Sequence, residues 1–350
     1  MSHANVYING QKVGYWPYGY NSFHFDITKY LKPGEKNTLA VRLENLPESS
    51  RWYPGAGLYR NVHLIITEDA YIPVWCTYIT TPSVNEKFAK VNVRTKVVLP
   101  EGADPAKYSV ETSVWNPNKQ KLTAVRTSLA QMKYNNNQAE QEFVIQAPSL
   151  WSPEMPALYS AETRLYEGDK LKDIYTTPFG IRSIEIIPDK GFFLNGKRTV
   201  FKGVCNHHDL GPLGAAVNDA AIRRQIRILK DMGCNAIRTS HNMPAPELIR
   251  ACDEMGMMIM AESFDEWNVA KCKNGYNLLF DEWAEKDLVN LLHNFRNNPS
   301  VVMWCIGNEV PNQWNEGDCK IAKWLQDICH REDPTRPVTQ GMDCLLYTSD

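Results

Sequence analysis

The 350-residue chain has no long apolar run, no excess of one charge and no paired cysteines. No run approaches the roughly 20 apolar residues that a membrane-spanning helix needs. The 38 lysines and arginines face 40 aspartates and glutamates, so a net charge of −2 gives no basic surface for nucleic acid or an anionic membrane. The nine cysteines include no Cys-x-x-Cys pair, which argues against a disulfide scaffold or a structural zinc site. We therefore expect neither a nucleic-acid partner nor a membrane partner.

The first 70 residues have the pattern of short strands joined by turns. The pair Asn9-Gly10 is a strong local signal for a β-hairpin. Three segments alternate between apolar and polar side chains, as half-buried strands do: residues 23–27, 37–43 and 62–66. The loop 51–60 is rich in aromatic, glycine and arginine residues, which suit a sugar surface or packing beneath the loop about equally well. We predict a β-sandwich over residues 1–70.

Residues 71–180 continue the all-β pattern with new turn signals. Alternating strands are predicted over residues 91–98, 108–114 and 141–145, with Asn-rich turns at 116–118 and 135–137. About 100 residues of this kind match the size of an immunoglobulin-like sandwich. No residues suited to catalysis stand out, so we interpret this part as a spacer.

Residues 181–350 change to alternating strands and helices. Helices are predicted at residues 219–232, 246–255, 281–297 and 318–330, between strands at 198–204, 236–239, 257–261, 301–306 and 337–341. Asp219 is the predicted cap of the first helix, whose apolar face is predicted to hold Ile222, Ile226, Leu229 and Met232. Repeated units of this length predict parallel strands with right-handed crossovers. A (β/α)8 TIM barrel is favoured over a doubly wound sheet because no Gly-rich phosphate turn follows the first strand. A complete barrel needs about 250 residues, so we expect about five of the eight strands, with the carboxyl-terminal part of the barrel missing.

Polar side chains stand at the carboxyl ends of four successive predicted strands. They occupy residues 206–209 (Asn-His-His-Asp), 238–242 (Arg-Thr-Ser-His-Asn), 262–267 (Glu-Ser-Phe-Asp-Glu-Trp) and 308–309 (Asn-Glu). Each has an ordinary structural explanation: His207 as a loop histidine, Arg238 in an ion pair, Glu309 as the cap of the next helix. Together they fit the rim where barrel enzymes place their active sites.

The types of residue at this rim favour carboxylate chemistry. His207, His208, Asp209 and His241 match no zinc spacing, and there is no Gly-x-Ser-x-Gly motif for a serine nucleophile. A polyhydroxylated substrate would use histidines and amides to bind its hydroxyls and Glu309 to move the proton. We predict a carbohydrate partner.

Several motifs resemble glycoside hydrolase family 2, the group of β-galactosidases, β-glucuronidases and β-mannosidases. The similar segments are residues 57–62 (Gly-Leu-Tyr-Arg-Asn-Val), 179–183 (Phe-Gly-Ile-Arg-Ser), 192–197 (Phe-Phe-Leu-Asn-Gly-Lys), 235–244 (Asn-Ala-Ile-Arg-Thr-Ser-His-Asn-Met-Pro) and 304–309 (Trp-Cys-Ile-Gly-Asn-Glu). The resemblance runs from about Val6 to Asp343. It implies a jelly-roll sugar-binding domain without its amino-terminal part, an immunoglobulin-like sandwich and a TIM-barrel catalytic domain.

The resemblance also implies roles for single residues. Glu309 would be the general acid/base of a retaining mechanism, and Asn308 would bind the sugar 2-hydroxyl. His207 and His241 would bind hydroxyls, and Arg238 would keep the nucleophile ionised. The nucleophile would be a second Glu on the seventh strand, outside this sequence. Glu262 and Asn61 complete the set of residues expected at the sugar.

Two departures limit the transfer of roles. Asn61 stands where the best-known β-galactosidases have an Asp that touches the sugar. Their Glu-x-His magnesium ligands are matched only by Glu266-Trp267-Asn268, so we expect no required metal or other cofactor, with Mg²⁺ or Na⁺ left open.

The sequence resembles a bacterial β-galactosidase-like branch most, and we predict a β-galactosidase, cytoplasmic or periplasmic, with a homo-oligomer left open for the full-length enzyme. The alternatives are a β-glucuronidase, another activity of the family, or a non-catalytic carbohydrate-binding fragment. We expect the 350-residue chain itself to be inactive because it lacks the nucleophile, and its closing residues 344–350 do not match the family.

Overall fold

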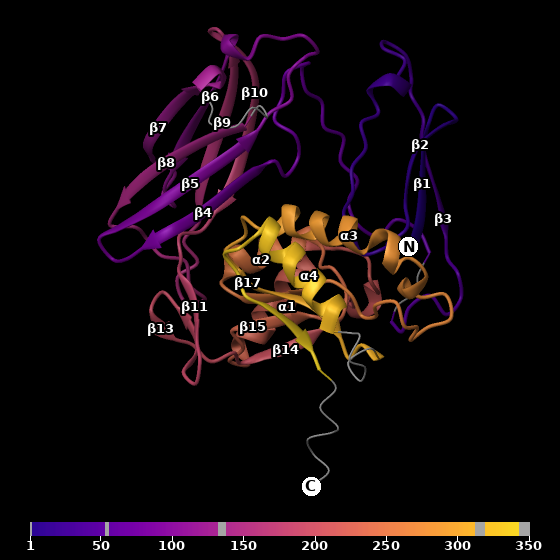
Figure 1. Ribbon diagram of the computed structural model, residues 1–350. Helices are drawn as coiled ribbons and strands as arrows, with labels where there is room; N and C mark the ends of the chain where they lie inside the picture. Colours follow the sequence, from indigo (N-terminus) through magenta and orange to yellow (C-terminus); the bar gives the residue numbers. More distant parts are fainter. Residues whose placement is uncertain (1, 53–55, 132–137, 312–318, 343–350) are drawn as a thin grey trace.

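The computed structural model describes residues 2–52, 56–131, 138–311 and 319–342 (Figure 1). Its N-terminal part contains one antiparallel sheet in the order β2-β1-β3, formed by β1 (Ser2–Ile8), β2 (Gln11–Trp16) and β3 (Leu39–Glu44). Asn9 and Gly10 join β1 to β2 with φ angles of 53° and 81°, the left-handed backbone that this turn pair favours. The predicted hairpin is therefore confirmed.

Two predicted strands of this part are wrong. Residues 23–27 and 62–66 form no regular strand. Leu64 is 70% exposed and Ile66 is 84% exposed, because no strand among the described residues pairs with this segment. An alternating pattern marks a segment that fits a sheet, but a strand also needs a neighbour for its backbone hydrogen bonds.

The middle part is a pair of antiparallel sheets that face each other (Figure 1). One sheet has the order β4-β5-β8 and the other β10-β9-β6-β7. Their bounds are β4 (Thr77–Val84), β5 (Phe88–Lys96), β6 (Tyr108–Trp115), β7 (Lys121–Ser128), β8 (Gln138–Gln146), β9 (Tyr159–Glu167) and β10 (Lys170–Phe179). Val91 and Phe143 of one sheet and Val114 and Ala161 of the other belong to one buried cluster. The predicted sandwich strands are present, whereas the predicted turn at 135–137 lies outside the described residues. The domain boundaries at residues 70 and 180 stay predictions.

The last part holds a parallel sheet in the order β14-β15-β16-β17-β18, with a helix in each of the four connections (Figure 1). The strands are β14 (Gly203–Asn206), β15 (Ala236–Thr239), β16 (Met258–Glu262), β17 (Val301–Asn308) and β18 (Val338–Gly341). The helices are α1 (Asp219–Asp231), α2 (Pro246–Met255), α3 (Phe280–Phe295) and α4 (Cys319–Glu332). Sequential parallel order is what successive βα units of a barrel produce. The predicted alternation of strands and helices is confirmed for these five strands.

The predicted strand 198–204 is divided between two sheets. Its start lies in a small antiparallel sheet of β11 (Ile184–Ile187), β12 (Gly191–Leu194) and β13 (Lys197–Arg198). Its end is the start of β14, where Gly203 lies opposite Ala236 in the parallel sheet. Residues 199–202 between them form no regular strand, so the prediction of one continuous strand is wrong.

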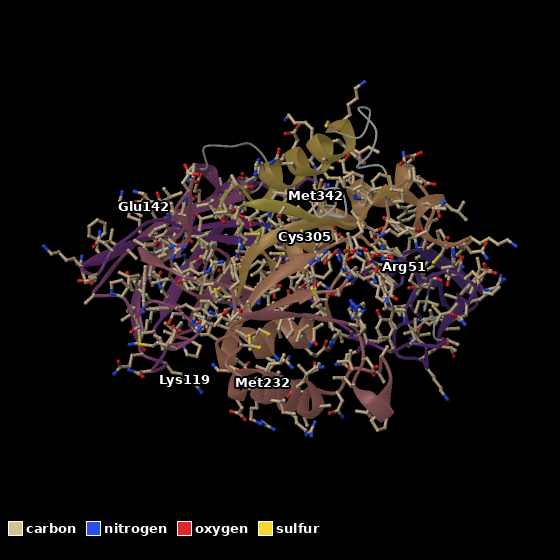
Figure 2. All side chains as sticks on the ribbon, turned by 90° about the horizontal axis from the view of Figure 1, so that it is seen from below. Arg51, Lys119, Glu142, Met232, Cys305 and Met342 are labelled. Atoms are coloured by element: carbon tan, nitrogen blue, oxygen red, sulfur yellow. The ribbon has the colours of Figure 1, made fainter. Side chains whose placement is uncertain are left out.

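Helix α1 shows how the local sequence sets its ends and its buried face. Ile222, Ile226 and Leu229 are buried as predicted. The N-cap is Asn218 rather than the predicted Asp219, because the Asn218 side chain accepts the Ala221 amide hydrogen at 2.9 Å. Met232 was predicted on the apolar face but is 69% exposed, since it follows the last helical turn and points outward (Figure 2).

The N-terminal part packs on the barrel through buried polar contacts. Asp287 of α3 is fully buried and accepts hydrogen bonds from Trp16 Nε1 and Asn21 Nδ2, both at 2.8 Å. Burial raises the pKa of Asp287 to about 6, against the effect of these bonds. Tyr18 donates its hydroxyl hydrogen towards Asn242 Oδ1 and the Ser263 carbonyl, each at 2.8 Å. These contacts fix the N-terminal part at the carboxyl edge of the parallel sheet.

None of the described helices combines the length and the apolar character needed to cross a membrane.

Candidate active site

The register of the parallel sheet brings the predicted polar residues to one edge. Asn206 lies opposite Thr239, Glu262 lies opposite Cys305, and Asn308 lies opposite Gly341. Each of the five strands has its last residue at this edge: Asn206, Thr239, Glu262, Asn308 and Gly341. The side chains that follow these residues therefore share one rim. The predicted convergence on this rim is what the sheet geometry produces.

A buried ion pair forms the floor of the rim. The Glu262 side chain has no exposed surface, and Arg238 Nη2 donates to its Oε1 at 2.9 Å. Arg238 Nε lies 2.7 Å from Oε2 as an ion-pair contact, and among the described residues this nitrogen makes no hydrogen bond. Burial raises the pKa of Glu262, and Arg238 and His241 oppose that shift. Burial alone would lower the pKa of Arg238, but the charge of Glu262 raises it above its usual value.

His241 also contacts the Glu262 carboxylate. Its Nδ1 lies 3.1 Å from Glu262 Oε1 and 3.2 Å from Oε2. Both oxygens of Glu262 are therefore occupied by protein groups. The direct sugar contact predicted for Glu262 stays a prediction, and in this arrangement its carboxylate orients Arg238 and His241.

Arg238 packs closely over the last strand of the sheet. A Cβ atom built on Gly341 of β18 would lie 2.3 Å from Arg238 Nη2. Such a distance is well inside van der Waals contact, so only glycine at 341 leaves Arg238 in this position. The same guanidinium nitrogen also donates to Asn308 Oδ1 at 3.0 Å.

Asn308 is held at three of its atoms. Its Oδ1 accepts from Arg238, and its Nδ2 donates to Asp265 Oδ1 at 3.0 Å. Its main-chain oxygen accepts from Lys271 Nζ at 2.5 Å. Arg238 can only donate and an ionised Asp265 can only accept, so these contacts fix which side of the amide carries the oxygen.

Glu309, the residue after Asn308, has an unusual backbone conformation. Its φ is 42°, the left-handed region that non-glycine residues rarely adopt. Its amide hydrogen bonds to the Gly341 oxygen at 2.8 Å, which helps to hold the conformation. The residue is exposed, and the described residues give its carboxylate no hydrogen bond. Arg51 and Lys271 are the cations that interact with it electrostatically.

Asp265 connects these cations to Asn308. Arg51 binds its two carboxylate oxygens at 2.9 and 2.6 Å, and Lys271 Nζ lies 3.1 Å from Oδ1. Burial would raise the pKa of Asp265, but the hydrogen bonds from Arg51 and Asn308 lower it below its usual value. Burial lowers the pKa of Lys271, while Asp265 opposes that shift. Asp265 is therefore an ionised centre with cations on two sides.

Aromatic rings line the mouth beside this network. The Trp52 ring centroid lies 4.7 Å from that of His207 and 5.1 Å from that of His241. The two histidine rings meet edge to face at 5.3 Å. Burial and the neighbouring His241 lower the pKa of His207, which favours its neutral form. An indole with imidazoles around it offers an apolar surface with hydrogen-bonding edges, as a sugar ring requires.

Asn61 lies apart from this cluster. Its Nδ2 donates to Glu247 Oε1 of α2 at 2.6 Å. Its neighbour Arg60 donates to the Tyr20 and Met243 main-chain oxygens. Both residues thus fasten the N-terminal loop to the barrel, and a sugar contact from Asn61 stays a prediction.

The residues at the position of a possible magnesium site do not fit that ion. Glu266 Oε2 accepts from the amides of Lys271 and Cys272 at 2.6 and 3.3 Å, and Oε1 accepts from Asn277 at 3.1 Å. A Cβ on Gly275 would lie 1.9 Å from Oε1, so the loop closes tightly around the carboxylate. Among the described residues no group of three or more His, Cys, Asp or Glu side chains could hold a metal ion. Glu266 organises its own loop.

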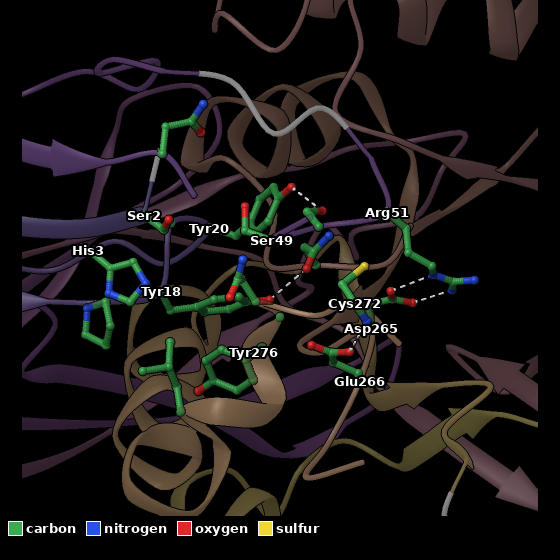
Figure 3. Close-up of a pocket in the computed structure, with 18 residues that line it drawn as sticks. Ser2, His3, Tyr18, Tyr20, Ser49, Arg51, Asp265, Glu266, Cys272 and Tyr276 are labelled. Carbon is green, nitrogen blue, oxygen red and sulfur yellow. Dashed lines mark hydrogen bonds and ion pairs between the residues drawn. The ribbon is translucent and has the colours of Figure 1, made fainter. Parts of the chain in front are cut away.

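A small cavity lies between the N-terminal part and this loop (Figure 3). It has a volume of about 70 Å³ and is lined by residues that include Tyr18, Tyr20, Cys272 and Tyr276. Ligand pockets usually occupy at least about 300 Å³, so this space is too small for a sugar. Figure 3 shows Arg51 pointing to the Asp265 carboxylate at the side of the cavity.

Three residues of the site were not predicted to act there: Asp265, Arg51 and Lys271. Asp265 stands within the polar segment 262–267, so its position at the rim could be inferred. Arg51 and Trp52 stand in the loop that suited a sugar surface, but the sequence does not indicate which side chain reaches the barrel. Lys271 gives no signal, because a lysine in a loop is usually solvated.

Two family descriptions match most of the chain. Residues 185–346 match "Glycosyl hydrolases family 2, TIM barrel domain" and residues 71–182 match "Glycosyl hydrolases family 2".

Curated relatives are similar along almost the whole chain. A β-galactosidase of Bacteroides ovatus is 45% identical over 97% of this chain and 43% of its own length. A putative β-glucuronidase of Formosa agariphila is 37% identical over 97% of this chain and 31% of its own length. A β-glucuronidase of Bacteroides fragilis is 31% identical over 97% of this chain and 50% of its own length. The chain thus spans at most half the length of these relatives.

Solved structures share the fold. A glycosyl hydrolase family 2 member from Bacteroides cellulosilyticus superposes with a TM-score of 0.92 and 36% identity, over 97% of this chain and 44% of the other. A β-glycosidase from Bacteroides vulgatus superposes with a TM-score of 0.89 and 36% identity, over 97% of this chain and 42% of the other. A β-glucuronidase from Bacteroides uniformis superposes with a TM-score of 0.81 and 27% identity, over 97% of this chain and 43% of the other.

Proposed function

Because the chain belongs to family 2 of the glycosyl hydrolases, we propose that its protein is a retaining β-galactosidase with Glu309 as general acid/base. The observation that carries this proposal is the pair Asn308-Glu309. Asn308 is fixed by three hydrogen bonds at the carboxyl end of β17, and the exposed Glu309 follows it at the mouth.

In the proposed reaction Glu309 acts twice. As an acid it gives its proton to the glycosidic oxygen while a second carboxylate attacks the anomeric carbon and the bond to the leaving group breaks. As a base it then takes a proton from water, whose oxygen displaces that carboxylate and releases the sugar. The two carboxyl groups of a retaining pair lie about 5–5.5 Å apart. We propose that the second carboxylate comes from outside these 350 residues, so the chain alone would not turn over substrate.

The residues around Glu309 have separate tasks in this proposal. Asn308 uses one Nδ2 hydrogen for Asp265. The described residues give the other hydrogen no bond, and in this proposal it binds the sugar 2-hydroxyl. His207 and His241 bind hydroxyls beside the Trp52 ring. Glu262 holds Arg238 and His241 in place.

The charges at the mouth favour a neutral sugar. Within the described residues, each cation at this mouth already faces a carboxylate: Arg238 pairs with Glu262, and Arg51 and Lys271 pair with Asp265. A glucuronide carboxylate would need a cation that is not so paired. The 45% identical relative is named a β-galactosidase, which supports the same choice.

A β-glucuronidase is the second candidate, since two of the relatives carry that name. Turnover of 4-nitrophenyl β-galactoside and β-glucuronide by the full-length protein separates the two. We expect the galactoside to be hydrolysed, galactose to inhibit and glucuronate to have no effect. The reverse preference would contradict the choice of sugar.

The same assay separates an enzyme from a non-catalytic sugar-binding protein. Glu309→Gln should lower kcat for the galactoside by roughly 10²–10⁴-fold, the usual contribution of general acid–base catalysis. Turnover by the wild type that Glu309→Gln leaves unchanged would exclude the proposed role. A wild type that binds galactose without turnover would favour the binding protein.

A further inference from the structure

A side chain of the N-terminal part reaches the catalytic edge of the barrel. Arg51 Nε and Nη2 bind the two oxygens of Asp265 at 2.9 and 2.6 Å (Figure 3). Such a two-pronged contact between planar groups is the strong and directional form of an ion pair. The Asp265 side chain is only 12% exposed, so water screens this pair less than a surface pair.

Asp265 passes this constraint to the residue before Glu309. The oxygen that faces Arg51 Nη2, Oδ1, also accepts the Asn308 amide at 3.0 Å and lies 3.1 Å from Lys271 Nζ. Lys271 in turn donates to the main-chain oxygen of Asn308. The Asn308 side chain and its peptide oxygen are therefore both tied to Asp265 or to a partner of Asp265.

This tie acts where the backbone is strained. Glu309 has a φ of 42°, and such a conformation persists only where the surroundings hold it. The peptide between Asn308 and Glu309 is held at both of its polar atoms. Lys271 Nζ donates to its oxygen, and its N–H donates a hydrogen bond to the Gly341 oxygen. Loosening Asp265 would allow this peptide to relax and turn the Glu309 carboxyl away from its position.

We propose that Arg51 is a positioning residue for Glu309, acting through Asp265 and Asn308 from outside the barrel. The inference rests on the proposed role of Glu309 as acid/base. Arg51 does not touch the reacting atoms; it keeps Asp265 oriented so that Asn308 and the following peptide stay in place. Its guanidinium also lies 4.2 Å from the Trp52 ring centroid, so the same contact steadies an aromatic side chain of the mouth.

The test compares Arg51→Met and Arg51→Lys in the full-length protein with 4-nitrophenyl β-galactoside. Arg51→Met should lower kcat roughly 10-fold while KM changes less than about 2-fold, because misplacing a catalytic group affects the transition state more than ground-state binding. Arg51→Lys should recover part of the loss, since an ammonium binds one oxygen of Asp265 but not both. Arg42→Met is the matched control, because within the described part of the chain the one ion pair of Arg42 is the exposed contact with Glu44 of the same sheet. An Arg51→Met variant with the kcat of the control would overturn the proposal.

A double variant tests the route through Asp265. Because both changes break the same chain of contacts, kcat of Arg51→Met with Asp265→Asn should equal that of Asp265→Asn alone. Losses that multiply would show that Arg51 acts by another route. The same two changes can also be compared by their effect on the free energy of unfolding. This measurement of their coupling needs no substrate. A wild type without glycosidase activity but with this coupling would refute the proposed function and leave the linkage, whereas an active wild type without coupling would refute the linkage alone.

Discussion

At the scale of single residues, the site depends on the charged side chains that hold Asn308. Asn308 is held by Arg238, Asp265 and Lys271, and all three are charged. Hydrogen bonds to charged groups are stronger than neutral ones. The amide that we expect to face the sugar is thereby fixed before substrate arrives, and fixed donors are what make such a site effective in catalysis.

Gly341 gives a prediction about this fixed arrangement. Gly341→Ala would place a methyl group 2.3 Å from Arg238 Nη2, so Arg238 must move away from Glu262 and Asn308. We expect the free energy of unfolding to fall by about 1–3 kcal/mol, as for other overpacked sites, and kcat/KM to fall with it. Urea unfolding and galactoside kinetics measure the two effects. Wild-type values for both would show that Arg238 is not held as described.

His208 predicts a pH dependence of stability. Burial lowers its pKa to about 3. Its Nε2 is buried and has no hydrogen-bond partner among the described residues, although the residue keeps some exposed surface. Below its ordinary pKa of about 6.5 the unfolded chain binds a proton at this residue and the folded chain does not, so folding stability falls as the pH falls from 6.5 towards 3. His208→Gln should therefore reduce the loss of stability between pH 7.5 and pH 5 by about 1–2 kcal/mol.

The matched control for this change is His330→Gln, since His330 is exposed on α4. Unfolding by urea at both pH values measures the difference for each variant. A His208→Gln protein with the same pH dependence as the wild type would contradict the burial of a neutral imidazole at this position.

At the scale of elements, the parallel strands could be predicted well and the loops could not. Arg238, Glu262 and Asn308 were expected at one rim because the carboxyl ends of neighbouring parallel strands meet there, and the register of β15 to β18 brings them together. Asp265 stands only three residues beyond β16, yet its main partner Arg51 lies 214 residues earlier. No local pattern encodes a contact of that separation. The segment 62–66 shows the converse: its local pattern predicted a strand, but no neighbouring strand among the described residues pairs with it.

The loop between β16 and α3 gives a prediction about metal ions. Glu266 binds three backbone amides of this loop, so it has no oxygen left that is free of a protein donor and properly placed for a metal. We expect dialysis of the full-length protein against EDTA to leave kcat for the galactoside within about 2-fold of its starting value. A loss that added Mg²⁺ restores would show that this loop opens to bind the ion.

At the scale of the whole molecule, the N-terminal part and the barrel form one site. Asp287 anchors Trp16 and Asn21. The same packing brings Arg51 to Asp265 (Figure 3) and Trp52 to His207 and His241. The order of the parts and the barrel-like alternation could be predicted from patterning alone. Their relative placement could not, because it is set by a few buried polar contacts between distant segments.

The proton that Glu309 gives to the leaving oxygen is the central claim, and the leaving-group dependence of Glu309→Gln tests it most directly. The measurement is kcat/KM of the full-length wild type and variant for phenyl and 2,4-dinitrophenyl β-galactosides. The phenyl substrate needs a proton as it leaves, so its kcat/KM should fall roughly 10²–10⁴-fold in the variant. The dinitrophenyl substrate leaves without a proton, and its value should fall less than about 10-fold. An equal loss for both substrates would contradict the role of Glu309 as the acid.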